Sequence, residues 1–323
     1  MHVLSVRGLR TIYRTPEGDA LALDGIDLDL SRGEMLGIIG ESGCGKTTAG
    51  FSILRSVKFP GVMTGGSVVL DGVDLAALPP EELRKRLGKD ITMIPQCAMN
   101  ALDPSWRVGD QIAEAIETHE PEVSPQKVRE RVQDLLRSVG LNREWARAYP
   151  HKLSGGMKQR VVIAMALACN PKVIVADEST TGLDVLVQAQ ILSLLRSVQK
   201  ERNLGVLLIS HDLPMVADIC DHIGIMYAGS LVELGTVEEI VHSPMHPYTK
   251  ALLGSQIRLA DLKTIVQPVE GTVPSLVGEH PGCRFRPRCA LGDDGCEGKK
   301  PALYVDGGTH SCACFKAEAL HGR

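Results

Sequence analysis

The stretch "MLGIIGESGCGKTTAG", residues 35–50, decides the fold of this chain. It opens with a continuous apolar run, Met35 to Ile39, which predicts a buried strand. The residues from Gly40 to Thr47 follow directly and fit the pattern G-x-x-x-x-G-K-[ST]. A strand before the pattern and a helix-like segment after it are the context in which it binds phosphate, which favours a phosphate loop over a glycine-rich turn matched by chance.

The chemistry of this loop suits the phosphates of a nucleotide. Its glycines let backbone N–H groups turn toward an anion, Lys46 supplies a positive charge to the β- and γ-phosphates, and Thr47 can bind Mg²⁺. The sequence therefore predicts a nucleotide-binding loop made of Gly40, Ser42, Gly43, Cys44, Gly45, Lys46, Thr47 and Thr48.

A second nucleotide feature lies downstream in "KVIVADEST". Val173 to Ala176 lacks polar alternation, as expected for a central parallel strand covered on both faces. The strand ends in Asp177 and Glu178, and ligands of open α/β sheets bind beyond the carboxyl ends of strands. We expect Asp177 to hold the Mg²⁺ hydration shell and Glu178 to polarise an attacking water; the alternative for such a pair is a solvated turn.

Between these features lies "LSGGMKQR". Ser154 is typical of a helix N-cap, Gly155 and Gly156 allow close backbone approach, and the apolar run Val161 to Ala168 predicts a buried helix. The start of this helix is a second anion site, distinct from the phosphate loop.

"LSGGMKQR" resembles the signature motif of ATP-binding-cassette (ABC) ATPases, and the phosphate loop and "VIVADE" make the resemblance specific. The resemblance implies a RecA-like α/β core with an antiparallel β subdomain and an α-helical subdomain. In this family two ATPase domains pair head to tail, so Ser154, Gly155 and Gly156 would contact the nucleotide of a partner. The resemblance therefore explains why one chain carries two anion sites.

Four further motifs of the family follow in order. Tyr13 resembles the aromatic residue that stacks on adenine, with a plain strand tyrosine as the alternative. Gln96 in "ITMIPQ" resembles the glutamine that contacts Mg²⁺ and the lytic water. "TTGLD", residues 180–184, matches the loop at the dimer seam, and His211 resembles the histidine that contacts the γ-phosphate. The resemblance thus implies the catalytic set Glu178, His211 and Gln96.

The region 97–160 corresponds to the helical subdomain, which in the family touches the membrane subunits. "SPQKVRERVQDLLRSVG" predicts a helix with Ser124 as N-cap, Pro125 at its first position and Gly140 as its terminator. Its apolar stripe consists of Val128, Val132, Leu135, Leu136 and Val139.

The stretch "HPYTKALL", residues 246–253, resembles the ATPases of the oligopeptide, dipeptide and nickel importers. This resemblance covers nearly the whole chain and predicts an ATPase domain at 1–255 and a cysteine-bearing tail at 256–323. Two positions depart from the subgroup pattern. Ser179 stands where proline is usual, and Cys97-Ala98 replaces an acidic residue and proline.

Composition limits the other function classes. The 323 residues are 44% hydrophobic and 23% charged with a net charge of −4, which gives no basic footprint for nucleic acid. Aromatic residues make up 3%, which argues against base-stacking platforms. The absence of an apolar run of about 18–20 residues and of a signal-like N-terminus predicts a cytosolic chain, unless a partner brings it to a membrane.

The tail holds five of the nine cysteines: Cys283, Cys289, Cys296, Cys312 and Cys314. In a reducing cytosol such a cluster favours a soft-metal site, zinc or iron–sulfur, over disulfides; reduced, unligated thiols are the remaining alternative. Arg284, Arg286 and Arg288 lie between the first cysteines and are expected to favour thiolates. The family resemblance implies a four-iron four-sulfur cluster on Cys283, Cys289, Cys296 and either Cys314 or Cys312.

The sequence thus predicts an ATP-hydrolysing subunit that powers import of peptides or related small solutes. The resemblance implies two permease subunits, a second, non-identical cassette ATPase, and an extracytoplasmic binding protein as partners, at the cytoplasmic face of the membrane, with ATP, Mg²⁺ and the cluster as cofactors. The alternative is a soluble cassette ATPase with a metal-sensing tail that is not coupled to transport.

Overall fold

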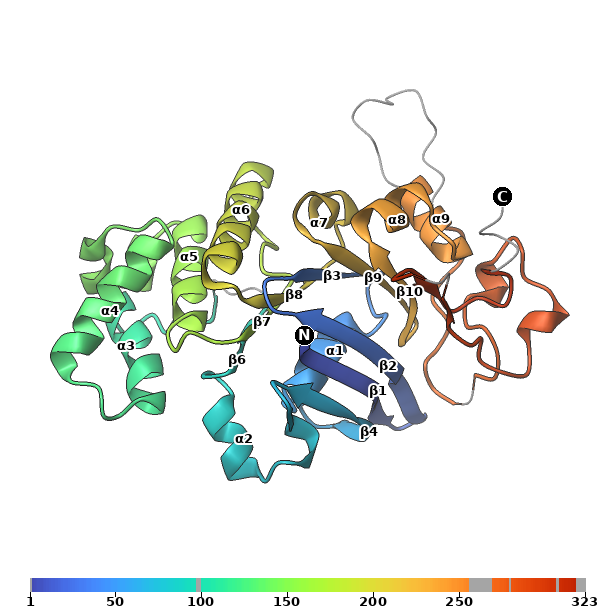
Figure 1. Ribbon diagram of the computed structural model, residues 1–323, viewed down its shortest axis with the longest axis horizontal. Helices are drawn as coiled ribbons and strands as arrows, with labels where there is room; N and C mark the ends of the chain where they lie inside the picture. Colours follow the sequence, from blue (N-terminus) through green and yellow to red (C-terminus); the bar gives the residue numbers. More distant parts are fainter. Residues whose placement is uncertain (1, 97–99, 256–268, 279, 306–307, 318–323) are drawn as a thin grey trace. The chain divides into compact units, whose positions relative to one another are not determined.

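The structure is a computed structural model that describes residues 2–96, 100–255, 269–278, 280–305 and 308–317 (Figure 1). The chain forms two compact units, each built from separate stretches of sequence. The first unit contains residues 1–5, 29–35 and 69–209, and the second contains residues 6–28, 36–68 and 210–323. The domain boundary at residue 255 stays a prediction, because residues 256–268 lie outside the described part.

The first unit is built on the parallel strands β6, β7 and β8. Its strands and helices are β5 (Val73–Asp74), β6 (Ile91–Ile94), β7 (Val173–Asp177), β8 (Gly205–Ser210), α2 (Pro80–Arg86), α3 (Val108–His119), α4 (Pro125–Ser138), α5 (Gly155–Ala166) and α6 (Val185–Arg202). Short 3₁₀ turns occupy Leu75–Ala77, Arg143–Arg147 and Pro150–Lys152. Strand β7 is central, with Val173 level with both Ile91 of β6 and Gly205 of β8.

Strand β7 confirms the prediction from "VIVAD". All of its residues from Val173 to Asp177 are buried, because a parallel strand in the middle of a sheet is covered on both faces. The strand is therefore apolar from Val173 to Ala176 and ends with the buried carboxylate of Asp177.

Helices α3, α4 and α5 pack against one another within the first unit (Figure 1). Helix α4 begins and ends as predicted, with Ser124 at the N-cap position, Pro125 at its first position and Gly140 in the left-handed region beyond its end. The predicted apolar stripe is buried, and it consists of Val128, Val132, Leu135, Leu136 and Val139. The stripe holds α4 because apolar area is removed from water along one face only.

The second unit combines an antiparallel sheet with the strand that leads into the phosphate loop. Its elements are β1 (His2–Thr15), β2 (Gly18–Ser31), β3 (Met35–Ile39), β4 (Gly61–Leu70), β9 (His222–Tyr227), β10 (Ser230–Thr236), β11 (Tyr304–Val305), β12 (Ser311–Cys312), α1 (Lys46–Ile53), α7 (Leu213–Ile219), α8 (Val237–His242) and α9 (Pro247–Gly254). Strands β1, β2, β3, β4 and β8 each cross from one unit to the other at one end. The order β2–β1–β4 and the parallel pairing of β3 with β9 confirm a mixed α/β fold with an antiparallel sheet.

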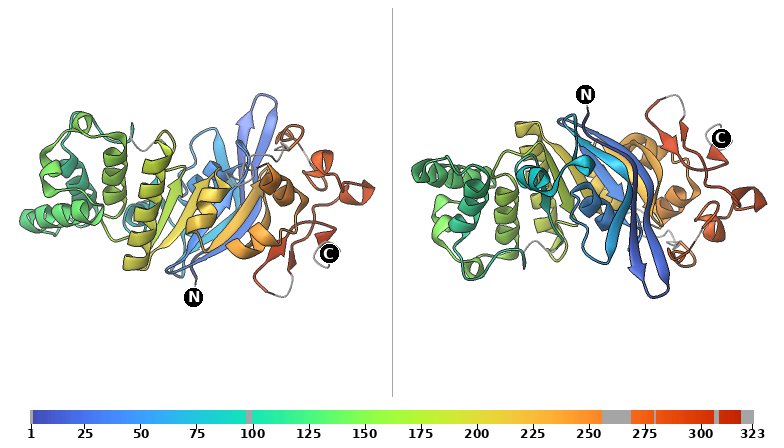
Figure 2. Two further views of the ribbon diagram at one scale, coloured as in Figure 1. Left: turned by 90° about the horizontal axis from the view of Figure 1, so that it is seen from above. Right: turned by 90° about the horizontal axis from the view of Figure 1, so that it is seen from below.

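The tail adds strands to the second unit rather than forming a separate body. Strand β10 pairs with β9 on one side and with β12 of the tail on the other, where Glu233 lies opposite Cys312. Strand β11 then pairs with β12. In Figure 2 the red tail lies beside the orange segment that holds α8 and α9, in agreement with this pairing.

A buried carboxylate fastens the tail to this sheet. Glu233 is fully buried and accepts the backbone N–H groups of Met245, at 2.6 Å, and of His246, at 3.0 Å. The Nε2 atom of His310, in the tail, lies 2.7 Å from the same carboxylate. Burial lowers the pKa of His246 to about 4, so its imidazole is neutral and its Nδ1 accepts the N–H of Tyr248.

Among the helices of the described residues, none combines the length and the apolar character that crossing a bilayer requires.

We predict that Glu233→Gln destabilises the protein, because a carboxamide has one acceptor oxygen and turns its NH₂ toward groups that donate. One donor left unsatisfied in the interior costs about 1–3 kcal/mol in the free energy of unfolding, measured by denaturant titration. Glu238→Gln on the exposed face of α8 is the matched control and should leave the midpoint unchanged. Equal midpoints for the two variants would contradict the anchoring role of Glu233.

Candidate functional site

The phosphate loop is shaped by two glycines that have no room for a side chain. A Cβ on Gly40 would lie 2.2 Å from the backbone oxygen of Met226, and one on Gly45 would lie 2.5 Å from that of Ala22. Gly45 also has a φ of +103° and immediately precedes α1. The loop therefore turns tightly into the helix, which aims the first N–H groups of α1 toward an anion.

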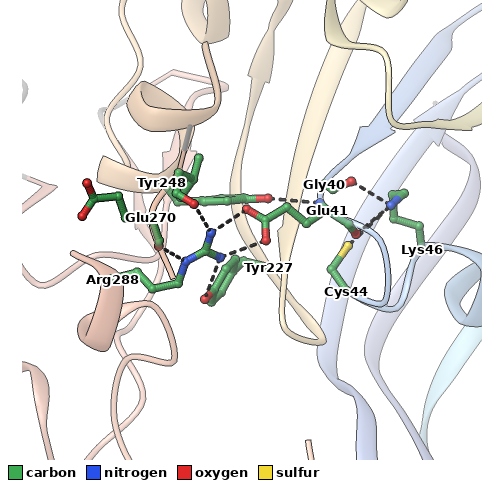
Figure 3. A network of polar contacts seen from close by, with 9 residues as sticks. Gly40, Glu41, Cys44, Lys46, Tyr227, Tyr248, Glu270 and Arg288 are labelled. Carbon is green, nitrogen blue, oxygen red and sulfur yellow. Dashed lines mark hydrogen bonds and ion pairs between the residues drawn. The ribbon is translucent and has the colours of Figure 1, made fainter. Parts of the chain in front are cut away.

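Lys46 is held inside this turn. Its side chain is buried, and its Nζ donates to the backbone oxygens of Gly40, at 2.8 Å, and Glu41, at 3.0 Å (Figure 3). Burial is the largest influence on neighbouring Cys44, and it raises the pKa of that thiol. Two backbone carbonyls thus hold the ammonium group of Lys46 in place, as a residue that contacts phosphate oxygens requires.

Tyr13 lies beside the same loop. Its hydroxyl is 3.5 Å from Oγ1 of Thr48, so the end of β1 and the start of α1 are in contact. This places an aromatic ring next to the predicted nucleotide loop, where stacking on a base is geometrically reasonable.

The first unit brings together two of the predicted catalytic residues. Nε2 of Gln96 donates to Oε2 of Glu178 at 2.8 Å, although the two residues are far apart in the sequence. The backbone of Glu178 is in the left-handed region, with a φ of +40°, which is strained for a residue with a side chain. Such a strained backbone persists where the surrounding structure fixes a functional side chain. The strained residue here, Glu178, directly follows the buried Asp177.

Thr181 is a contact of Glu178 that the sequence analysis missed. Its Oγ1 donates to Oε2 of Glu178 at 3.3 Å, which gives the carboxylate a second donor. The three-residue spacing in a turn was the available signal, but "TTGLD" was interpreted as a dimer-seam loop only. Ser179, the departure from proline, is buried, and Cys97-Ala98 lies outside the described residues.

The signature residues lie at the start of α5, as predicted. Ser154 is the N-cap, and its hydroxyl accepts the N–H of Met157 at 3.3 Å. Ser154 is exposed, and a Cβ on Gly156 would lie 2.8 Å from Val187 at the start of α6. The seam loop leads into α6, where Asp184 is the N-cap.

An exposed apolar pair follows this loop directly. Val185 is 79% exposed and Leu186 is 69% exposed, although both begin a helix whose other face is buried. His211 is exposed as well; it follows β8 and precedes Asp212, the N-cap of α7. The residues predicted for ATP binding and hydrolysis thus fall into one group on each unit: the phosphate loop, Tyr13 and His211 on the second, the others on the first.

The thiols of the tail form an electrostatically connected group. Cys283 interacts with Cys296 and Cys314, and Cys289 and Cys314 interact with each other and with Cys296. Burial raises the pKa values of Cys283, Cys289 and Cys314, while backbone N–H groups directed at these three sulfurs act against it. Cys312 is fully buried in a small core with Met245 and Ala317.

The arginines of the tail do not serve these thiols as expected. Arg284 donates to the backbone oxygen of Ala228, Arg286 pairs with Asp294 and Glu297, and Arg288 pairs with Glu41. Their guanidinium groups are taken by carboxylates and carbonyls. Burial raises the pKa values of Cys289 and Cys314, and the positive charge of Lys316 acts against this rise. The expectation that the arginines favour thiolates is therefore wrong, and Lys316 is the cation that does so.

The tight phosphate loop, the strand ending in Asp177 and Glu178, and the capped signature helix define an ATPase cassette. The profile of the ABC transporter family matches residues 23–181, and that of the oligopeptide/dipeptide transporter C-terminal region matches residues 232–296. The chain belongs to the ABC transporter family of ATPases, in the branch that carries this C-terminal region.

Relatives and solved structures agree with this assignment. The dipeptide transport ATP-binding protein DppD of Bacillus subtilis is 41% identical over 97% of this chain and 94% of its own length. DppD of Escherichia coli is 40% identical over 97% of this chain and 96% of its own. The dimeric cassette MJ0796, in a post-hydrolysis state with ADP and Pi, is 28% identical with a TM-score of 0.65, over 72% of this chain and 98% of that one.

We predict that Glu178→Gln lowers ATP turnover and leaves ATP binding intact, because the phosphate loop is unchanged while the base is lost. A positioned base contributes about 10²- to 10⁴-fold, so kcat should fall within that range. Glu201→Gln, on the exposed end of α6, is the control and should hydrolyse ATP at the parental rate. Turnover of Glu178→Gln comparable to that of the control would remove Glu178 from this role.

Proposed function

We propose that this chain powers the import of peptides or related small solutes by hydrolysing ATP at the cytoplasmic face of a membrane. It would act with two permease subunits, a second, non-identical cassette and, indirectly, an extracytoplasmic binding protein. The observation that carries the proposal is the exposed surface made by Ser154 of the signature and by Val185 and Leu186 after the seam loop. The relatives named for dipeptide transport support the class of solute.

This surface needs a partner for a physical reason. Val185 and Leu186 are neighbours at the start of α6 and both expose apolar area to water, and burial of that area against a partner is favourable. The signature presents the start of α5, which Ser154 caps and which favours an anion. A second cassette that brings a bound nucleotide satisfies both.

The residues of the site divide the reaction between them. Lys46 and the loop N–H groups bind the β- and γ-phosphates, and Tyr13 offers its ring to the base. Glu178 accepts a proton from the attacking water, Gln96 orients that carboxylate, and His211 contacts the γ-phosphate. When Mg²⁺ is bound, Thr47 and Gln96 would hold it and Asp177 would hold its hydration shell, as the resemblance implies, and the ion would supply charge neutralisation at the phosphate oxygens.

The proposal is tested on the complex purified from its native membrane with this chain as bait. We expect permease subunits and a second cassette to co-purify, and vesicles made with the complex to take up labelled dipeptides when ATP is supplied. Leu186→Glu, on the exposed surface, should reduce uptake by tenfold or more, since a buried charge at an interface costs about 2 kcal/mol or more. Leu303→Glu, an equally large change at an exposed apolar residue of the tail, is the control.

Each negative outcome has a distinct meaning. Permeases that co-purify without dipeptide uptake would overturn peptides as the solute. Absence of permeases would overturn coupling to transport and favour the soluble cassette ATPase.

We further propose that Cys283, Cys289, Cys296 and Cys314 hold an iron–sulfur cluster. Backbone N–H groups of Phe285 and Arg286 point at the first sulfur, that of Leu291 at the second, and that of Lys316 at the fourth, at 3.5 Å. Donors aimed at sulfur suit thiolate ligands of a cluster. We choose Cys314 rather than Cys312 as the fourth ligand, because Cys314 interacts with all three of the other thiols, whereas among these three Cys312 interacts with Cys283.

The tail fits a metal cluster in the type of its candidate ligands, which are cysteine thiols. Among the described residues, no three or more His, Cys, Asp or Glu side chains form a group that could hold a metal ion. A four-iron cluster binds each cysteine through a different iron, so its ligands stand farther apart than those of a single ion. The resemblance and the directed N–H groups support the cluster, and measurement of iron decides it.

We predict that protein purified without oxygen is brown and contains iron and acid-labile sulfide, and that Cys314→Ser removes both. Cys312→Ser, two residues away, should keep the colour because Cys312 is not a ligand. Cys220→Ser, a buried cysteine outside the tail, controls for the loss of a thiol. Zinc in stoichiometric amount without iron would contradict the cluster, and bleaching by Cys312→Ser alone would reverse the assignment of the fourth ligand.

A further inference from the structure

Arg288 of the tail reaches the phosphate loop (Figure 3). Its Nη1 and Nη2 donate to the two carboxylate oxygens of Glu41, at 2.9 and 3.0 Å. Glu41 is the second residue of the loop, directly after Gly40. A fork of two parallel, charge-assisted hydrogen bonds fixes orientation as well as distance, which a single contact does not do.

The guanidinium group is itself held from the other side. Nε donates to the backbone oxygen of Glu270 at 2.7 Å, and Nη2 donates to that of Val269 at 2.9 Å. Nη1 lies 3.3 Å from the hydroxyl of Tyr227, and the guanidinium stands 5.7 Å above the ring of that tyrosine. The side chain of Arg288 is only 5% exposed. Arg288 is therefore a preorganised clamp and not a surface ion pair, which would contribute little.

Glu41 is in turn tied to the residue that binds phosphate. Its backbone N–H donates to the hydroxyl of Tyr248 at 3.1 Å, and its backbone oxygen accepts from Nζ of Lys46 at 3.0 Å. Burial raises the pKa of Tyr248, so the phenol stays protonated. Glu41 thus contacts two cations through different groups. Its backbone oxygen accepts from Lys46, and its carboxylate is turned away toward Arg288 (Figure 3).

We propose that Arg288 is a positioning residue for ATP binding: it fixes the first turn of the phosphate loop and keeps the carboxylate of Glu41 away from Lys46. A Glu41 side chain released from this clamp is a negative charge within reach of the ammonium group of Lys46. It would compete with the phosphates of ATP for that cation and would repel them. The tail therefore contributes to the nucleotide site through one side chain.

The test measures the dissociation constant of Mg·ATP for the full chain by equilibrium dialysis, with every variant built on Glu178→Gln so that ATP is not consumed. We expect Arg288→Gln to weaken ATP binding by about tenfold, the size of one lost charge-assisted interaction. In the double variant Glu41→Gln/Arg288→Gln the loose charge is gone, and we expect affinity to return to that of Glu41→Gln alone. In the Glu178 parent, KM for ATP should rise with Arg288→Gln while kcat at saturating ATP stays close to its original value.

Two variants separate this role from simple anchoring of the tail. Arg286→Gln removes a guanidinium from the same turn, where it pairs only with Asp294, Glu297 and the backbone of Asp293 among the described residues, and should leave ATP affinity unchanged. Should Arg288→Gln fail to fold, Arg288→Lys replaces it; it keeps the charge, loses the fork, and is expected to weaken binding less, with the same rescue by Glu41→Gln.

A lower melting temperature with unchanged ATP affinity would overturn the proposal and leave Arg288 as an anchor. Weakened binding that Glu41→Gln does not relieve would overturn it as well, because the proposed cause acts through that carboxylate.

Discussion

The phosphate loop can close only because positions 40 and 45 carry no side chain. Backbone oxygens of Met226 and Ala22 occupy the space that a Cβ would need, so the strands on which those residues lie define the inner wall of the loop. The same turn places Lys46 at the start of α1, where its Nζ donates to the backbone oxygen of Gly40. Tyr13 lies beside the same turn, with its hydroxyl 3.5 Å from Oγ1 of Thr48.

Local sequence determines the parts of this fold that could be predicted. Strands β3 and β7, the cap and stripe of α4, and the start of α5 at Ser154 each follow from residues within one or two turns of one another. Periodicity and caps report such short-range choices directly. Resemblance to a family placed Gln96 and Glu178 in one catalytic set, and the structure brings the two side chains to hydrogen-bonding distance.

Contacts between distant segments carried no readable signal. Arg288 is the last of three arginines that occupy every second position between Cys283 and Cys289, which suggested that its charge serves the thiols. It serves Glu41 instead, because a carboxylate that can accept both N–H groups of a fork outcompetes a neutral or weakly charged sulfur. Likewise, the sequence left open whether Cys314 or Cys312 is the fourth ligand. In the structure Cys312 pairs with β10 and is buried, and both Cys312 and Cys314 interact with Cys283.

The tail belongs to the second unit, together with the phosphate loop, because polar side chains of the tail contact buried polar groups in the rest of that unit. Glu233 would be a costly buried charge without donors from the segment before α9 and from His310. The carboxylate of Glu41 is held away from Lys46 by the guanidinium group of Arg288, which is itself preorganised by the backbone oxygens of Val269 and Glu270. Arg288 directly precedes Cys289, so the backbone that sets the position of the thiol also sets that of the clamp. A tail too short to form a core of its own is thus ordered by its contacts with the domain. Once ordered, the tail holds Arg288 in the position from which it fixes Glu41 of the phosphate loop.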